Sequence, residues 1–234
     1  DGSLPTKRLD PKLIVRSRWA NRHALSFTDR EFDDLKKDIS EQGGNVQPIK
    51  VRRMKGDAEK YEIIFGHRRH QACLDLGIDV SAIIDDLDDK HLFIEMDREN
   101  RQRKDLRPYE IGCMYAKALD EGLFPSARKL AEEVGIDHSQ LSKALSLARL
   151  PTDILNAFQS PLDLQYRWVT SLTDALQKDP EHVLAVANAV QAENPKPASS
   201  DVLARLVQGR GTVPHPDSKE ETVAGKSNQK GKIA

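Results

Sequence analysis

One stretch of the chain decides its fold class, and it reads Ser126-Ala127-Arg128-Lys129-Leu130-Ala131-Glu132-Glu133-Val134-Gly135-Ile136-Asp137-His138-Ser139-Gln140-Leu141-Ser142-Lys143-Ala144-Leu145. Ala131 is small where two helices would cross closely, and Gly135 follows four residues later at the predicted turn. Ile136, Leu141 and Leu145 supply the apolar anchors. We expect a larger side chain at either small position to push two such helices apart, so the spacing predicts a helix-turn-helix.

The second predicted helix carries polar side chains near its N-terminus, where a recognition helix meets base edges. Asp137 or Ser139 is expected to cap it. Glutamine can bond adenine with two hydrogen bonds, and lysine can bond guanine or phosphate. An ordinary helical hairpin with a solvated polar face is the alternative. The residues predicted to face DNA are Ser126, Arg128, His138, Ser139, Gln140, Ser142, Lys143 and Arg149.

On the C-terminal side, apolar residues keep helical spacing from Pro108 almost to residue 207, which predicts an all-α domain at 108–209. Prolines separate its later helices. The segment 210–234 is rich in Gly, Ser, Lys and Pro, and we expect a disordered linker or tail there. The later helices are predicted at 152–159, 165–177, 180–193 and 199–208.

On the N-terminal side, the pattern predicts a small α/β domain at 13–107 behind a flexible arm at 1–12. A helix begins after Asp29 and stops at Gly43, and two strands at 48–52 and 61–65 surround a turn. A helix at 68–76 and a strand at 80–84 follow. The whole chain is therefore predicted to be α+β, with an N-terminal α/β domain followed by an all-α domain.

The overall composition limits how the chain can bind nucleic acid. Its 36 Lys and Arg face 37 Asp and Glu, so any affinity for DNA must come from local patches. Cys73 and Cys113 have no neighbours at metal spacing and are expected to be reduced core residues of a cytoplasmic protein. No apolar run approaches the roughly 18 residues of a membrane span. The chain opens at Asp1 rather than Met, so we expect a fragment with domains missing.

A first phosphate-type motif is Ile64-Phe65-Gly66-His67-Arg68-Arg69-His70-Gln71-Ala72. It places a glycine where a strand passes into a helix, with two arginines in the first helical turn. Free backbone N–H groups and the helix dipole favour an anion there, and arginines add paired donors. A solvated, arginine-rich first turn is the alternative.

A second motif runs from Glu99-Asn100 through a basic cluster to Pro108-Tyr109-Glu110. Carboxylate and amide oxygens suit Mg²⁺ beside a phosphate, so Glu99 and Asn100 are predicted metal ligands. A charged connector between domains is the alternative. Asp85, Asp86, Asp88 and Asp89 are interpreted as an acidic surface loop.

Taken in order, these motifs resemble the ParB family of partition proteins over roughly residues 10–150. Gln47-Pro48-Ile49 matches the family's Gln-Pro-Ile strand start, and Gly66 to Ala72 matches its Gly-Glu-Arg-Arg-x-x-Ala box, with His67 replacing Glu. Glu99 to Glu110 matches its Glu-Asn-x-Gln-Arg box, and the helix-turn-helix follows. Trp19-Ala20-Asn21-Arg22 and Gly43-Gly44-Asn45-Val46 are more similar to the plasmid branch typified by the F-plasmid protein SopB.

The resemblance implies that the first domain binds CTP with Mg²⁺. Because the family's Glu bears on hydrolysis, His67 implies a chain that binds CTP and hydrolyses it slowly. Arg22 corresponds loosely to a basic residue before the family's first helix. The nucleotide-binding residues implied are Arg22, Gln47, Gly66, His67, Arg68, Arg69, Glu99, Asn100 and Arg103.

The resemblance also implies loading at a palindromic parS-like site on double-stranded DNA, clamp closure and spreading in plasmid or chromosome segregation. Expected partners are a ParA-type ATPase and a second copy of the chain, held through a C-terminal dimerisation domain absent here. The resemblance further implies a cytoplasmic protein that associates with the nucleoid or with a plasmid.

Three other classes of protein remain open on the sequence. A helix-turn-helix transcriptional repressor would use the same DNA motif without a nucleotide. A nuclease or nucleotide-dependent kinase on a ParB-like fold would not need the helix-turn-helix. A generic α/β structural protein needs neither motif.

Overall fold

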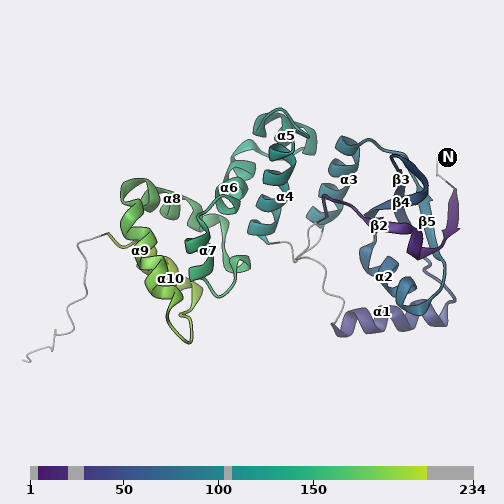
Figure 1. Cartoon of the computed structure of the whole chain (residues 1–234), viewed down its shortest axis with the longest axis horizontal. Coiled ribbons are helices and arrows are strands. Elements are labelled where there is room, and N and C mark those ends of the chain that lie inside the picture. Colours follow the sequence, from purple (N-terminus) through teal and green to yellow (C-terminus); the bar gives the residue numbers. More distant parts are fainter. Residues whose placement is uncertain (1–4, 21–28, 103–106, 210–234) are drawn as a thin grey trace, which may run out of the picture.

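The computed structural model describes residues 5–20, 29–102 and 107–209 (Figure 1). A unit containing a sheet lies at one end of the long axis, two groups of helices follow, and the last group lies at the other end. The predicted α+β fold class is confirmed, with an N-terminal α/β unit followed by an all-α part.

One mixed sheet forms the N-terminal unit. Its central hairpin is antiparallel and turns at Gly56, whose φ of +89° favours glycine. The pairs on either side of this hairpin, β3·β5 and β2·β4, are parallel, and β1 runs antiparallel to β5. The spatial order is β1-β5-β3-β4-β2, with β1 at Thr6–Leu9, β2 at Ile14–Arg16, β3 at Ile49–Met54, β4 at Asp57–Phe65 and β5 at Val80–Ile84.

Helices cover both faces of this sheet, and β4 shows why. Successive side chains of a strand point to opposite faces. Ile63 packs in a core with Phe32 and Ala72, whereas its neighbour Ile64 packs with Phe93 in another. The helices are α1 (Arg30–Glu41) and α2 (His67–Leu76) on the first face, and α3 (Asp89–Gln102) on the second.

The helix-turn-helix is present as predicted. Its two helices pack on α4, and Leu130, Leu141 and Tyr115 are all buried. Trp19, in the chain just after β2, lies in the same core and meets Phe93 edge-on at 5.8 Å between ring centroids. The helices are α4 (Pro108–Asp120), α5 (Ala127–Val134) and α6 (His138–Ala148).

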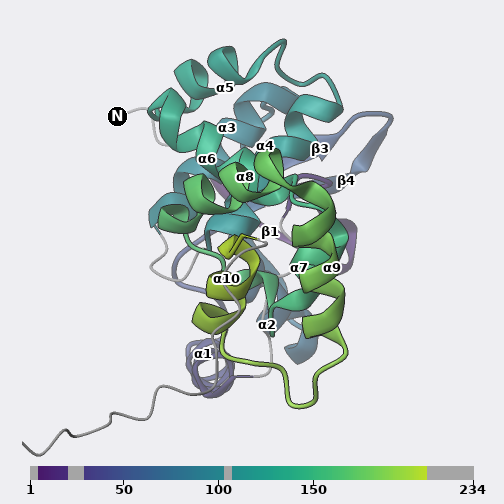
Figure 2. The same ribbon diagram turned by 90° about the vertical axis from the view of Figure 1, so that its left-hand side faces the viewer.

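The last helices form a second all-α core, in which Phe158 stacks on Trp168 with ring centroids 6.1 Å apart. Figures 1 and 2 both place α5 and α1 at opposite edges of the molecule. No helix in the described part of the chain is long and apolar enough to cross a membrane. This unit contains α7 (Thr152–Ala157), α8 (Val169–Lys178), α9 (Pro180–Gln191) and α10 (Ser199–Val207), with 3-10 turns at Pro161–Asp163 and Tyr166–Trp168.

The structure differs from the predicted flexible arm. Residues 6–9 form edge strand β1, and Pro11–Leu13 forms a 3-10 turn capped by Asp10. The strand is almost entirely exposed and polar, so it has no alternating apolar pattern to reveal it; its backbone hydrogen bonds to β5 order it. The predictions for residues 1–4 and 210–234 lie outside the described residues.

The predicted reason for Gly135 is also wrong. A Cβ on Gly135 would meet nothing within 4 Å, and the residue is glycine because it ends α5 at φ +71°. The close helix crossing lies elsewhere, at Gly112 of α4, where a Cβ would lie 2.0 Å from the Ala144 carbonyl oxygen and 3.1 Å from the Ala148 Cβ. The α4–α6 contact therefore sets how the recognition helix is held.

We predict that Gly112→Ala destabilises the chain by about 1–3 kcal/mol, because it overpacks this crossing. The same change at a free helical position would stabilise by about 1 kcal/mol. Urea unfolding followed by circular dichroism measures the difference. Gly209→Ala, which lies outside any helix, is a control for the added methyl group alone, since a Cβ there meets nothing within 4 Å. Unchanged or increased stability of Gly112→Ala would contradict the close crossing.

Candidate functional site

The polar face of α6 has the exposure expected of a recognition helix. Asp137 caps the helix, its Oδ1 accepting from the backbone N–H groups of Ser139 and Gln140 at 2.8 and 3.3 Å. Leu141 and Ala144 point into the core, while the predicted DNA-facing residues of α6 are all exposed. Within the described part of the chain, no group lies in hydrogen-bond distance of the Gln140 amide or the Lys143 ammonium. These two side chains are therefore available to a ligand.

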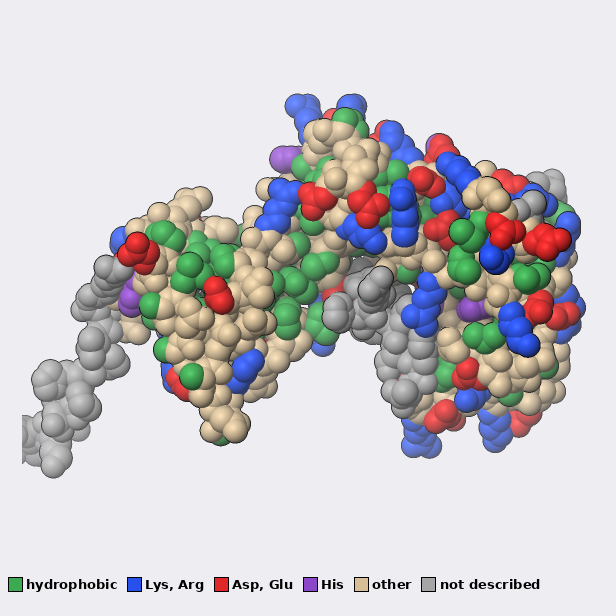
Figure 3. All heavy atoms as spheres, in the orientation of Figure 1, with side chains coloured by type: hydrophobic (Ala, Val, Ile, Leu, Met, Phe, Trp, Pro, Cys, Tyr) green, Lys and Arg blue, Asp and Glu red, His purple; other side chains and the backbone are tan. Residues whose placement is uncertain are grey.

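The other predicted DNA-facing residues are exposed but already make internal contacts. Ser126 caps α5, its Oγ accepting from the Lys129 N–H at 3.2 Å. Arg128 pairs with Glu132, and Arg149 with Asp120 at 3.2 Å. In Figure 3, Lys and Arg side chains project at the edge where α5 lies. The first helix of the motif carries two basic and two acidic side chains, so it adds no net charge beside the recognition helix.

The N-terminus of α2 forms the second site. Gly66 precedes the helix at φ +94°, and a Cβ there would lie 2.6 Å from Ile49 Cγ2, so only glycine fits. Gly66 has no side chain to cap α2, and no side-chain cap from another described residue is seen at this helix start. Its N–H groups and dipole therefore favour an anion. His67, at the first helical position, is half-buried.

The two arginines of this turn have different partners. Arg68 donates two hydrogen bonds to the Asp29 carboxylate, from Nη1 at 2.9 Å and from Nη2 at 2.6 Å. Hydrogen bonding to Arg68 holds the pKa of Asp29 below its usual value. Arg69 instead donates to the backbone carbonyls of Gln47 and Pro48 at 2.9 and 3.0 Å. Arg69 thereby joins the Gln-Pro-Ile segment to the first turn of α2.

The second motif meets the first at Glu99. Burial lowers the pKa of Arg69, and the nearby Glu99 carboxylate offsets this in part. Asn100 is buried and its amide nitrogen donates to the Met114 sulfur at 3.7 Å, which places it in the α3–α4 contact. The structure thus brings together Gln47, Gly66, Arg68, Arg69 and Glu99, while Arg22 and Arg103 lie outside the described residues.

A polar clasp on α3, which the sequence did not reveal, ties the α/β unit to the helix-turn-helix through the buried Asp97 and the more exposed Arg101. Tyr115 of α4 donates to the Asp97 carboxylate at 2.7 Å, and Arg101 lies 2.8 Å from its other oxygen. Arg101 also donates to the Val134 carbonyl at the end of α5, at 2.6 Å. Burial raises the pKa of Asp97, although Tyr115 and Arg101 both act to lower it. The clasp lies three residues or fewer from Glu99 and Asn100.

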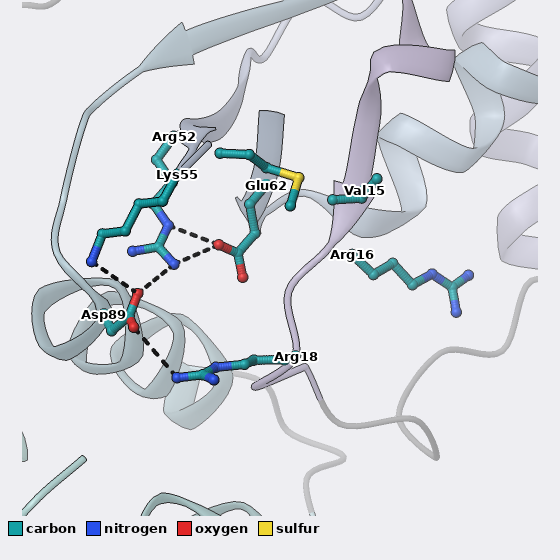
Figure 4. Close-up of a pocket in the computed structure, with 8 residues that line it drawn as sticks. Val15, Arg16, Arg18, Arg52, Lys55, Glu62 and Asp89 are labelled. Atoms are coloured by element: carbon teal, nitrogen blue, oxygen red, sulfur yellow. Dashed lines mark hydrogen bonds and ion pairs between the residues drawn. The ribbon is translucent and has the colours of Figure 1, made fainter. Parts of the chain in front are cut away.

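A hollow of about 280 Å³ lies beside β2, β4 and the start of α3 (Figure 4). Arg52 is at its base: Nε donates to Glu62 at 2.8 Å and Nη2 lies 2.7 Å from Asp89. Burial alone would lower the pKa of Arg52, but Glu62 and Asp89 raise it. Arg18 and Lys55 also approach Asp89, at 3.4 and 3.9 Å.

These ion pairs revise the predicted acidic surface loop. Asp85 pairs with Lys50 at 2.8 Å, Asp86 with Arg53, and Asp88 with His91 at 2.9 Å, while Asp89 begins α3. Asp85, Asp86 and Asp89 therefore tie the loop and the start of α3 to β3, whereas Asp88 bonds within the start of α3. Among the described residues, no group of three or more His, Cys, Asp or Glu could hold a metal ion.

An exposed recognition-type helix and a separate basic helix N-terminus define a two-domain helix-turn-helix protein. A family model described as "ParB N-terminal domain" matches residues 3–100, and one described as "Centromere-binding protein HTH domain" matches residues 107–180. The chain therefore contains a ParB N-terminal domain at residues 3–100, followed by a centromere-binding type of helix-turn-helix domain at residues 107–180.

Individual relatives agree with this assignment. Chromosome-partitioning protein Spo0J of Thermus thermophilus is 35% identical over 57% of this chain and 48% of its own length. A nucleoid occlusion protein of Listeria monocytogenes is 32% identical over 70% of this chain and 56% of its own. The chain thus spans about half the length of these relatives. The solved pNOB8-like ParB N-domain shares the fold, with a TM-score of 0.57 and 13% identity over 88% of this chain and 93% of that one.

We predict that Arg52→Ala lowers the free energy of unfolding by about 3–5 kcal/mol, because it leaves the buried Glu62 carboxylate without its partner. Arg53→Ala is the matched control: it is the neighbouring residue and also pairs with an aspartate, but both partners are about half exposed. Its loss should cost less than about 1 kcal/mol. Denaturant unfolding of both variants measures the two losses in the free energy of unfolding. Equal small losses would mean that the Arg52 network contributes little to stability.

Proposed function

We propose that this chain binds a palindromic, parS-like centromere site on double-stranded DNA and acts as a CTP-dependent clamp in plasmid or chromosome segregation. The observation that carries the proposal is the exposed face of α6, where the side chains of Gln140 and Lys143 have no hydrogen-bond partner among the residues that the structure describes. Gln and Lys suit base edges and phosphates. The matches to a ParB N-terminal domain and to a centromere-binding helix-turn-helix domain support the same function.

The nucleotide part of the proposal rests on the first turn of α2. Arg68, Arg69 and the uncapped N–H groups would hold the phosphates of CTP, and the Gln47-Pro48-Ile49 segment would line the site. Mg²⁺ usually keeps one or two protein carboxylates plus substrate phosphates, so Glu99 fits such a site without a larger acidic cluster. Asn100 fits less well, since its amide nitrogen is bonded to Met114. When bound, Mg²⁺ would neutralise phosphate charge.

We propose that CTP acts in this chain mainly as a switch. His67 stands where the family's box has Glu, and a neutral imidazole is a poorer ligand for a hard cation and carries no negative charge. CTP would therefore be bound and hydrolysed slowly. The clasp from Asp97 and Arg101 to α4 and α5 gives α3 a direct contact with the DNA-binding unit.

The proposed partners follow from the same assignment. They are a ParA-type ATPase and a second copy of the chain, joined through a C-terminal dimerisation domain. Association with nucleoid or plasmid DNA would follow from binding the centromere site.

We predict that Gln140→Ala and Lys143→Ala each weaken binding to the cognate site by about 1–3 kcal/mol. Gln140→Ala should relax the preference at one base position. A palindromic site selected from a random library and titrated by fluorescence anisotropy measures both effects. Gln177→Ala and Lys178→Ala, exposed residues of the same two types at the C-terminal end of α8, are the controls. If both α6 variants bind like wild type, α6 is not the recognition helix.

We predict that the chain binds CTP in preference to ATP, GTP and UTP, and that His67→Glu raises CTP turnover on cognate DNA, because it restores a carboxylate beside Mg²⁺. Calorimetric titration gives the affinities, and phosphate release gives the turnover. A wild type that already hydrolyses CTP as fast as His67→Glu would remove the role given to His67. A chain that binds DNA but no nucleotide would instead be a repressor without nucleotide dependence.

A further inference from the structure

Arg68 is bound to a carboxylate of its own chain at the point where a phosphate is proposed to bind. Both terminal nitrogens are used, at 2.9 and 2.6 Å from the two oxygens of Asp29. Carboxylate and phosphate are recognised by arginine through the same paired geometry and the same charge. The hydrogen-bond partners of Arg69 are neutral backbone carbonyls, so Arg68 is the arginine of this turn that is hydrogen-bonded to a carboxylate.

Asp29 also caps a helix, which restricts the substitutions that can test the Asp29–Arg68 pair. Its Oδ1 also accepts from the backbone N–H of Phe32 at 2.7 Å and so caps α1. Phe32 is buried in the core beneath α1 and α2, and the Arg68 guanidinium lies 5.7 Å from its ring centroid. Asp29 therefore couples the start of α1 to the first turn of α2.

We propose that Asp29 is an intrachain counterion that competes with nucleotide phosphate for Arg68 and thereby sets the nucleotide affinity of the site. The inference rests on the proposed nucleotide site and adds a residue that the sequence motifs did not include. Nucleotide binding exchanges a carboxylate for a phosphate at Arg68. Asp29 then keeps only its hydrogen bond to the start of α1. Because the Asp29–Arg68 pair must be broken before the phosphate can bind, the nucleotide affinity is lower than it would be without Asp29.

The decisive variant is Asp29→Asn. Asparagine caps a helix as well as aspartate does, so α1 should remain formed while the charge that holds Arg68 is removed. Calorimetric titration of the whole chain with Mg²⁺-CTP should then give a dissociation constant about three- to fivefold lower than wild type, the effect expected for a partly exposed pair. Helical content should be unchanged.

Asp33→Asn is the matched control. It removes the same charge from the first turn of the same helix, at an exposed position, and should leave the affinity close to wild type. Arg68→Ala should weaken CTP binding, and adding Asp29→Asn to it should bring no gain, because the group competed for is gone.

Each outcome decides a different point. Equal or weaker binding by Asp29→Asn, beside normal binding by wild type, overturns the competition and leaves the nucleotide site intact. The competition is also overturned if Asp33→Asn raises the CTP affinity as much as Asp29→Asn does, or if Asp29→Asn still raises it in the Arg68→Ala background. Either result would mean that the gain comes from the general loss of negative charge. Absence of CTP binding in wild type and every variant overturns the nucleotide site itself, and the role of Asp29 with it.

Discussion

The burial of α3 is the constraint on which the rest of the structure depends. Its Leu92, Phe93 and Met96 enter one core with Ile64 of the sheet and Trp19 of the preceding chain. The same core contains the helix-turn-helix side chains Leu130 and Leu141. Apolar burial of this kind is the main favourable term in folding, and here it cannot be completed by either unit alone. The DNA-binding helices are therefore packed directly on the α/β unit through α3.

Polar contacts make this packing specific. The pairs of Arg52 with Glu62 and Asp89 hold the start of α3, and the clasp from Asp97 and Arg101 holds its other half. The buried members, Arg52, Glu62 and Asp97, are costly unless their partners are present. Glu99 lies on the same helix as Asp97 and Arg101, so α3 connects the proposed nucleotide site to the helix-turn-helix.

The arginines of the α2 turn illustrate the same principle at a partly open site. Each has a partner in the chain, one a carboxylate and the other a pair of backbone carbonyls. An incoming anion thus exchanges one set of interactions for another and gains only the difference. The affinity of such a site is decided as much by what the free protein offers its arginines as by the arginines themselves.

The sequence by itself determined the fold class, the central hairpin, the helix-turn-helix, the Gly66 junction and the polar face of α6, because these depend on local periodicity and on neighbouring residues. Only the tertiary structure decided that β1 is a strand, that Gly112 rather than Gly135 makes the close crossing, and that Asp29 reaches Arg68. Each of these depends on a partner 32 or more positions away, such as Ala144 for Gly112 and Arg68 for Asp29. Backbone pairing of a polar edge strand and contacts between distant side chains leave no periodic signal, since the partner is chosen by packing and not by the adjacent sequence.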